Sequence, residues 1–110
     1  MPYYKSFDET LCGHNGFQFE VGKEFTTDNE DTWERFHMCR SIKDTLPYYK
    51  NPRVCIVEPI DGVTDFDEGL VSCSKIRIVR ELTKEEILNK LKKERVTKKF
   101  IRFIYKSFLA

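Results

Sequence analysis

The sequence predicts an α+β fold: a small bent, mostly antiparallel sheet with one short inserted helix and a long C-terminal amphipathic helix. Three observations lead to this prediction. Apolar and polar residues alternate at 17–22, which is the period of a half-buried strand. A β-branched run follows at 54–57, and the longest helical pattern comes only after residue 82. This order of elements, with the strands first and the long helix last, differs from the alternating strands and helices of a parallel α/β sheet.

The first third of the chain predicts two strands joined by turns. Residues 3–7 form the first strand, and the glycine- and aspartate-containing segments 8–10 and 13–16 are typical of turns. The second strand covers residues 17–21, where three apolar side chains alternate with polar ones, and Gly22 then permits a kink. We expect the polar segment 27–32 to be a solvated loop whose return to the core is anchored by Trp33 and Phe36.

The stretch Phe36–Tyr49 is the central feature of the sequence, and we call it the hub. It begins with an extended piece that ends at Cys39, and it contains one of the two histidines of the chain. Ser41, with Asp44 three residues later, predicts the start of a short helix. Pro47 limits this helix to one or two turns, because proline lacks the backbone N–H that a longer helix would use.

Two further strands are expected between the hub and residue 82. The run 54–57 is the strongest strand signal of the chain, and Pro59 ends its regular pairing or places it at an edge. Asp61-Gly62 predicts a turn, and residues 65–69 predict a second acidic loop. In the segment 75–80, Ile76 and Ile78 point to one side of the sheet and the intervening residues to the other.

Residues 83–110 form the predicted C-terminal helix, and residues 1–82 the α+β body. Thr83 and Glu86 have the spacing of a capping box, and Val96-Thr97 is a weaker patch where the helix can break. The helix packs on the body or on a partner, and a homodimer is one such partner. The body carries ten Lys/Arg and fifteen Asp/Glu, whereas the tail carries nine Lys/Arg and three Asp/Glu. The chain therefore combines an acidic body with a basic tail.

Composition excludes several classes of protein. The chain of 110 residues is long enough for one hydrophobic core, and its start lacks the basic and apolar regions of a signal peptide. The stretches of apolar residues are too short for a transmembrane helix. The four cysteines are widely spaced without a C-x-x-C motif, so we expect a cytoplasmic protein with reduced thiols.

Four motifs together resemble an uncharacterised phage and prophage domain family. They are Cys12 followed by GFQFEVGKEF at 16–25, FHMC at 36–39, Tyr48-Tyr49, and SKIRIVRELT at 74–83. Members of this family often stand at the head of proteins with pentapeptide repeats. The resemblance covers roughly residues 3–86 and implies a viral or mobile-element origin, hence the cytoplasm of a host cell, but it implies no activity.

A weaker topological resemblance is to the ADP-ribosyltransferase fold. That resemblance implies NAD as a cofactor and a catalytic glutamate on a late strand, for which Glu58 and Glu68 are the candidates. The first strand offers Tyr4 and Lys5 where that fold carries Arg or His. The resemblance therefore implies a non-catalytic relative more readily than an enzyme.

A ligand-binding cleft is the first candidate site, because aromatic side chains with a few polar groups line small-molecule pockets. Its candidate residues are His37, Tyr4, Tyr48, Tyr49 and Glu58. No catalytic residue is assigned, since the spacing places no second catalytic group beside His37.

A zinc site is the second candidate. The pairs Cys12/His14 and His37/Cys39 each place two zinc-binding side chains on one face of a strand. Their spacing differs from that of common zinc fingers, so the favoured interpretation is structural, with Cys39 as a small buried apolar residue. We therefore expect no metal.

A basic surface on the tail is the third candidate, and it can bind nucleic-acid phosphates or an anionic membrane. Its residues are Lys92, Lys93, Lys98, Lys99, Arg102 and Lys106. The first functional hypothesis is a non-enzymatic phage-type accessory protein that binds a host protein, with a possible role against host defence. The alternatives are a diverged NAD-binding protein and a nucleic-acid or nucleotide binder that acts through the tail.

Overall fold

The structure is a computed structural model that describes residues 2–13, 16–31, 34–67 and 69–109. In this part of the chain seven strands form one sheet, and two single 3-10 turns and two α-helices accompany it. The strands are β1 (Tyr3–Phe7), β2 (Glu24–Thr26), β3 (Phe36–Cys39), β4 (Arg53–Pro59), β5 (Thr64–Asp67), β6 (Leu70–Cys73) and β7 (Lys75–Glu81). The 3-10 turns are η2 (Ile42–Asp44) and η3 (Leu46–Tyr48), and the helices are α1 (Lys84–Lys93) and α2 (Lys98–Leu109).

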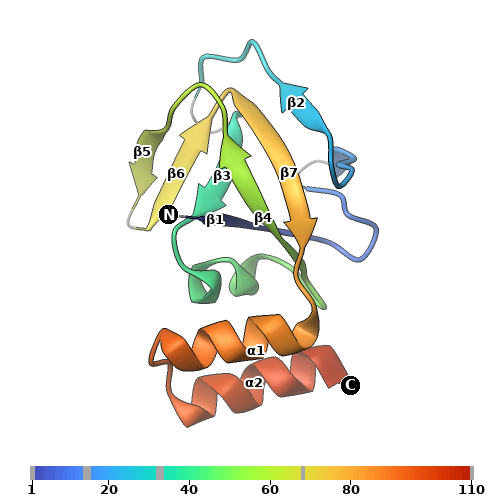
Figure 1. Ribbon diagram of the computed structural model, residues 1–110, viewed down its shortest axis with the longest axis vertical. Coiled ribbons are helices and arrows are strands. Elements are labelled where there is room, and N and C mark those ends of the chain that lie inside the picture. The colour runs from blue at the N-terminus through green and yellow to red at the C-terminus, as the bar shows by residue number, and fades with distance from the viewer. Residues whose placement is uncertain (1, 14–15, 32–33, 68, 110) are drawn as a thin grey trace.

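The sheet has the strand order β2-β7-β4-β1-β3-β6-β5, and neighbouring strands pair antiparallel. The predicted α+β class and antiparallel sheet are thus confirmed. Figure 1 shows the sheet in the upper part of the molecule, the two 3-10 turns beneath it, and α1 and α2 stacked below the turns. The C-terminal helices therefore form a separate layer at one end of the molecule, which we call the helical layer.

One face of the sheet is covered by aromatic side chains. Phe7 and Ile76 are fully buried here, and Phe19 packs edge-on against Phe7 with ring centroids 5.0 Å apart. Phe19 also packs against Phe25 and Phe36, at 5.1 and 5.8 Å. The chain segment between β1 and β2 thus covers this face with rings instead of with a helix.

The predicted strand at 17–21 is wrong. Apart from one isolated bridge between Cys12 and Gln18, this segment does not pair with a strand. The side-chain amide of Gln18 donates to the carbonyls of Thr10, Leu11 and Phe19, so a side chain satisfies backbone groups that a neighbouring strand would satisfy. The alternating pattern does not correspond to burial, since of its three apolar residues Phe19 is buried whereas Phe17 and Val21 are exposed.

The opposite face of the sheet packs on the hub and on α1. Tyr4, Val54 and Leu82 from the sheet meet side chains of η2, η3 and α1 in a second core cluster, which also contains Ile42, Leu46, Ile87 and Leu91. The buried Ser6 hydroxyl donates to the carbonyl of Thr45 at 2.7 Å and ties β1 to the hub. The hub is therefore the layer between sheet and helices.

The short helix predicted in the hub is present, but its form and its cap differ from the prediction. It forms two consecutive 3-10 turns, and the side chain of Ser41 makes no capping hydrogen bond. The carboxylate of Glu94 instead accepts hydrogen bonds from the backbone N–H groups of Ile42 (2.9 Å) and Lys43 (3.1 Å). A residue more than fifty positions away thus takes the role that the local sequence assigned to Ser41.

The predicted long C-terminal helix is also wrong, because the chain breaks it into α1 and α2. Arg95 adopts a left-handed conformation with φ of 59°, which ends α1. The hydroxyl of Thr97 accepts a hydrogen bond from the N–H of Phe100 and starts α2. The break falls at the Val96-Thr97 patch. The capping box of Thr83 and Glu86 at the start of α1 is confirmed.

The acidic segment 65–69, expected to be a loop, contributes to the edge strand β5. Thr64 lies opposite Ser72, and the register shifts between Asp65 and Asp67. Charged side chains and a bulge are common on edge strands because they discourage pairing with another chain. In the described part of the chain, neither helix has the length and apolar character needed to cross a bilayer.

Replacement of Leu91 by alanine tests the docking of α1. Leu91 is completely buried between the sheet and the hub, so we expect Leu91→Ala to lower the free energy of unfolding by about 2–5 kcal/mol in urea denaturation. Asn89→Ala, on the exposed side of the same helix, is the control and should change it by less than about 0.5 kcal/mol. Equal effects of the two substitutions would contradict the packing of α1 on the sheet.

Candidate functional site

The candidate site is a groove between the hub and the connection from α1 to α2, with a volume of about 600 Å³. The sheet contributes the floor, where Cys39 on β3 lies opposite Leu70 on β6. The remaining lining comes from the two sides: Lys43, Asp44, Pro47 and Tyr48 from the hub, and Arg95, Val96, Thr97 and Phe100 from the helical layer. We call it the hub groove.

The carboxylate of Glu94 shapes the hub groove. By bonding to the N–H groups at the start of η2, it holds the end of α1 against the hub. The left-handed backbone of the next residue, Arg95, then turns the chain, so that Val96 and Phe100 pack against the second core cluster. The two walls of the groove are thus fixed by a charge-assisted contact and by apolar packing.

Gly69 explains how the Asp44 carboxylate fits beside the turn before β6. A Cβ atom at Gly69 would lie only 2.8 Å from Asp44 Oδ2, and the backbone φ of Gly69 is +74°. Both facts favour glycine at this position. Lys43 and Arg95, which are both exposed, give the groove two cations against this one carboxylate.

The hub groove combines a protonated thiol with apolar, aromatic and cationic side chains. Burial, followed by the charge of Asp44, raises the pKa of the Cys39 thiol to about 11. At neutral pH the sulfur therefore stays protonated, whereas a nucleophilic cysteine reacts as the thiolate. The other groove side chains supply aromatic and aliphatic surface with cations nearby, which is the composition of a recognition site.

The structure places two residues of the predicted cleft at or near the hub groove. Tyr48 lines it and is 59% exposed. His37 precedes Cys39 by two residues on β3, is half-buried and lies opposite Ser72. Its backbone carbonyl accepts a hydrogen bond from the Lys5 ammonium at 2.8 Å.

The other cleft candidates lie elsewhere. Tyr4 is buried in the second core cluster, and the pKa of Tyr49 is raised by burial and then by Asp8 and Cys12, which places Tyr49 toward the turn after β1. Glu58 is exposed on β4 and lies 3.7 Å from Arg77. Glu68, the alternative carboxylate, lies outside the described residues.

The pairing register separates Glu58 from His37. Val57 lies opposite Tyr3 and Cys39 opposite Tyr4, so Glu58 lies toward the start of β1 and His37 toward its end. Four residue steps along β1 correspond to roughly 13 Å, and the two side chains also stand on different strands. The five cleft candidates thus do not converge on one point.

Of the disfavoured zinc alternative, only part of the site lies within the described residues. His14 lies outside the described residues, and among those described no group of three or more His, Cys, Asp or Glu side chains could hold a metal. Cys12 donates its S–H to Gln18 Oε1 at 3.2 Å, and all four cysteines are free thiols.

Lys5 is a cation that the sequence analysis did not explain. Its ammonium lies within 6 Å of the ring centres of Phe7 and Phe19, and burial lowers its pKa to about 8. Only one residue pair, Tyr4 with Cys39, is in register between β1 and β3. Lys5 therefore donates a hydrogen bond to a β3 carbonyl at the point where the strands diverge, which is a structural role. The same hydrogen bond and the two nearby aromatic rings stabilise the positive charge of its ammonium group.

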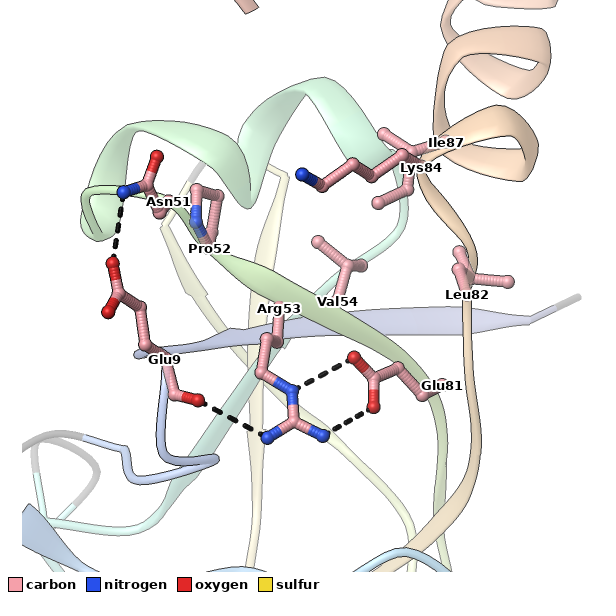
Figure 2. A pocket seen from close by; sticks show the side chains of 9 residues that line it. All are labelled: Glu9, Asn51, Pro52, Arg53, Val54, Glu81, Leu82, Lys84 and Ile87. Atoms are coloured by element: carbon pink, nitrogen blue, oxygen red, sulfur yellow. Dashed lines mark hydrogen bonds and ion pairs between the residues drawn. The ribbon is translucent and has the colours of Figure 1, made fainter. Parts of the chain in front are cut away.

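A second pocket, of about 360 Å³, lies where β4 begins and β7 ends (Figure 2). Its polar groups bind one another. Arg53 donates to both carboxylate oxygens of Glu81, at 2.9 and 2.6 Å, and to the carbonyl of Glu9. The Glu9 carboxylate in turn accepts from the Asn51 amide. This pocket therefore holds strand ends together, and each of the three guanidinium nitrogens of Arg53 already donates a hydrogen bond.

The basic residues of the helical layer differ from those of the body. Among the described residues, every ion pair involves an arginine of the body: Arg40, Arg53, Arg77 and Arg80. The exposed cations Lys92, Lys93, Lys98, Lys99 and Arg102 form no ion pair within that part of the chain. The side chain of Lys106 lies outside the description.

The carboxylates of the helical layer explain this difference. Glu86 binds Arg80 and the N–H of Thr83, and Glu94 binds the hub. Two of the three acidic residues in 83–110 are thus directed toward the body or the helix start. Lys92, Lys93, Lys98, Lys99 and Arg102 therefore face no ion-paired carboxylate among the described residues.

Sequence reasoning missed Lys43, Asp44, Leu70, Arg95 and Phe100 as parts of one groove. They come from three separated segments, and the contact that joins them is the long-range bond from Glu94 to the hub. The Val96-Thr97 break was the available signal, because a chain reversal there brings the second helix back toward the hub.

Thiol labelling tests the environment of the cysteines. Burial raises the pKa values of the thiols of Cys39 and Cys73 to about 11 and that of Cys55 to about 12. We expect a maleimide at pH 7.5 to modify Cys12 quickly and these three slowly, and to modify all four at similar rates in denaturant. Fast labelling of Cys39 in the native protein would contradict its assignment as a packed apolar residue.

The Arg53–Glu81 pair predicts a pH dependence of stability. The hydrogen bonds from Arg53 lower the pKa of Glu81 below its usual 4.5, so the stabilisation is present above that pH and is lost as pH falls through the lowered folded-state value. We expect Glu81→Gln to be less stable than the wild type at pH 7 and the difference to shrink below about pH 4.5. Urea melts from pH 7 to pH 3 measure it, and a difference independent of pH would contradict the assignment.

Comparisons with known proteins bear on the chain as a whole. Comparison with curated proteins and with solved structures gave no match. A family model, the Domain of unknown function (DUF7666), matches residues 1–90, which include the sheet, the hub and the first two turns of α1. The chain therefore belongs to the DUF7666 family.

Proposed function

We propose that this protein acts by binding a macromolecule and not by catalysis, and that the partner is a nucleic acid whose phosphates contact the helical layer. The observation that carries the proposal is the set of exposed cations at 92–102 that find no carboxylate in the described part of the chain. Nucleic-acid phosphates are the polyanionic groups that such a surface binds, with release of counterions.

The distribution of charge supports this arrangement. The tail has six more basic than acidic residues and the body five more acidic than basic ones, and Figure 1 shows the helices at one end of the molecule. A polyanion therefore approaches the helical end and is repelled by the body. Such a dipolar molecule orients its partner during association.

A host protein with an acidic surface is the second candidate partner. Phe103 is 62% exposed on α2, and aromatic side chains next to cations are common at the centres of protein interfaces. A setting in the host cytoplasm and a role against host defence follow from the resemblance to phage proteins, and they belong to this proposal.

An NAD-binding function has less support. It requires His37, the tyrosines and a glutamate to meet in one cleft, whereas Glu58 and His37 are separated along β1 by roughly 13 Å. The hub groove offers no Gly-rich loop for a pyrophosphate. NAD is therefore a suitable comparison ligand in the binding experiments.

Salt-dependent binding tests the proposal. We expect a fluorescein-labelled 12-nucleotide single strand to bind in 50 mM salt, with log K falling linearly as log salt rises. Replacement of both Lys98 and Lys99 by glutamine should weaken binding and reduce the slope by about 0.7 for each lost phosphate contact. Fluorescence anisotropy measures both quantities.

Lys23→Gln is the control, since Lys23 is an exposed lysine before β2, away from the helical layer (Figure 1). It should leave the affinity and the slope unchanged. Absence of binding at 50 mM salt, or equal effects of the control and the double variant, would overturn the nucleic-acid proposal. Binding of NAD alone would favour the alternative.

A further inference from the structure

We propose that the hub groove receives an unpaired base of a single-stranded nucleic acid, stacked on Tyr48, while the flanking phosphates contact the helical layer. The inference rests on the proposed function and specifies its substrate class, single strands in preference to duplexes. Three features carry it: the exposure of Tyr48, the apolar floor of the groove, and the cations at its rim.

Tyr48 is the first feature. Its side chain is 59% exposed, although its neighbours Leu46 and Thr45 are almost completely buried. It stands at the end of η3, and Pro47 before it fixes the backbone of this turn. A tyrosine ring held at the rim of a groove is a surface on which any of the nucleic-acid bases can stack, because every base has a π-face.

The shape and lining of the groove are the second feature. A volume of about 600 Å³ accommodates a base with its sugar, in the range of small-ligand sites. Leu70 and Cys39 form an apolar floor, and Phe100 adds an aromatic side chain from α2. Because the Cys39 thiol is protonated at neutral pH, the floor stays uncharged and suits the face of a base.

Charge at the rim is the third feature. Lys43 and Arg95 stand on opposite walls, and Asp44 is the one carboxylate among the described lining residues. From Arg95 the chain continues directly into Lys98, Lys99 and Arg102 on α2. A strand that places a base in the groove therefore has exposed cations for its backbone at the groove rim and on the helix that follows.

A duplex does not offer this contact. Its bases are stacked on one another and paired, so none enters the groove without the cost of unpairing. A duplex uses only the phosphate contacts of the helical layer. Preference for single strands is therefore the property that separates the stacking proposal from charge attraction alone.

The test compares the binding of a 12-nucleotide DNA strand and a 12-base-pair duplex to the full chain at one salt concentration. We expect the single strand to bind more tightly. Tyr48→Leu, which keeps apolar bulk but removes the ring, should weaken single-strand binding roughly 5- to 150-fold and leave duplex binding unchanged. Tyr48→Phe keeps the ring and should retain the preference.

Phe103→Leu is the matched control, because Phe103 is comparably exposed on α2 but does not line the groove. It should keep the ratio of single-strand to duplex affinity. A second readout uses the unaltered protein: 2-aminopurine in the middle of the single strand should lose fluorescence on binding, as a stacked base does. This measurement stays valid if a Tyr48 variant fails to fold.

The outcomes separate the two proposals. Binding of neither nucleic acid would overturn the proposed function, and the base site with it. Equal binding of strand and duplex, unchanged 2-aminopurine fluorescence, or an equal loss of both on Tyr48→Leu would overturn the base site and leave phosphate binding by the helical layer intact.

Discussion

The bond from the Glu94 carboxylate to the hub is the contact on which the arrangement of the site depends. It satisfies two N–H groups that a 3-10 turn would otherwise leave exposed at its start, and it fixes where α1 ends. Arg95 then reverses the chain, which brings α2 back toward the hub and completes the groove. One charged side chain thus links the turn, the helix end and the candidate site.

The two faces of the sheet are buried by different elements. The aromatic face is covered by Phe19 from the segment between β1 and β2, which packs on the rings of Phe7, Phe25 and Phe36 from the strands. No helix is needed on this face. The hub and α1 therefore supply the fully buried contacts of the opposite face, with Ile87 and Leu91 in its core cluster. From α2, Phe100 packs at the edge of this cluster, whereas Lys98, Lys99 and Arg102 are exposed.

The sequence predicted what depends on local chemistry and missed what depends on distant contacts. The capping box at Thr83, the strand at 54–57 and the antiparallel α+β class follow from local patterns and are confirmed. The strand expected at 17–21 failed because the Gln18 side chain replaces a neighbouring strand. The short helix of the hub is present as 3-10 turns, but the predicted cap at Ser41 is wrong because Glu94 caps the first turn from another element. Tyr48 was predicted as a site residue from its residue type, but the groove that it lines could not be predicted because one wall comes from the start of α2.

The family model matches only some of the residues that line the hub groove. The model covers residues 1–90, which include Cys39, the hub and Leu70. Arg95, Val96, Thr97 and Phe100, which form the opposite wall, lie beyond that match, as do most cations of the helical layer. The residues that match the family model therefore supply Tyr48 and the sheet floor, and the segment that follows supplies the opposite wall and most of the cations. A different continuation after residue 90 would also replace the buried Leu91 and the carboxylate of Glu94, so it would alter the docking of α1 together with the walls of the groove.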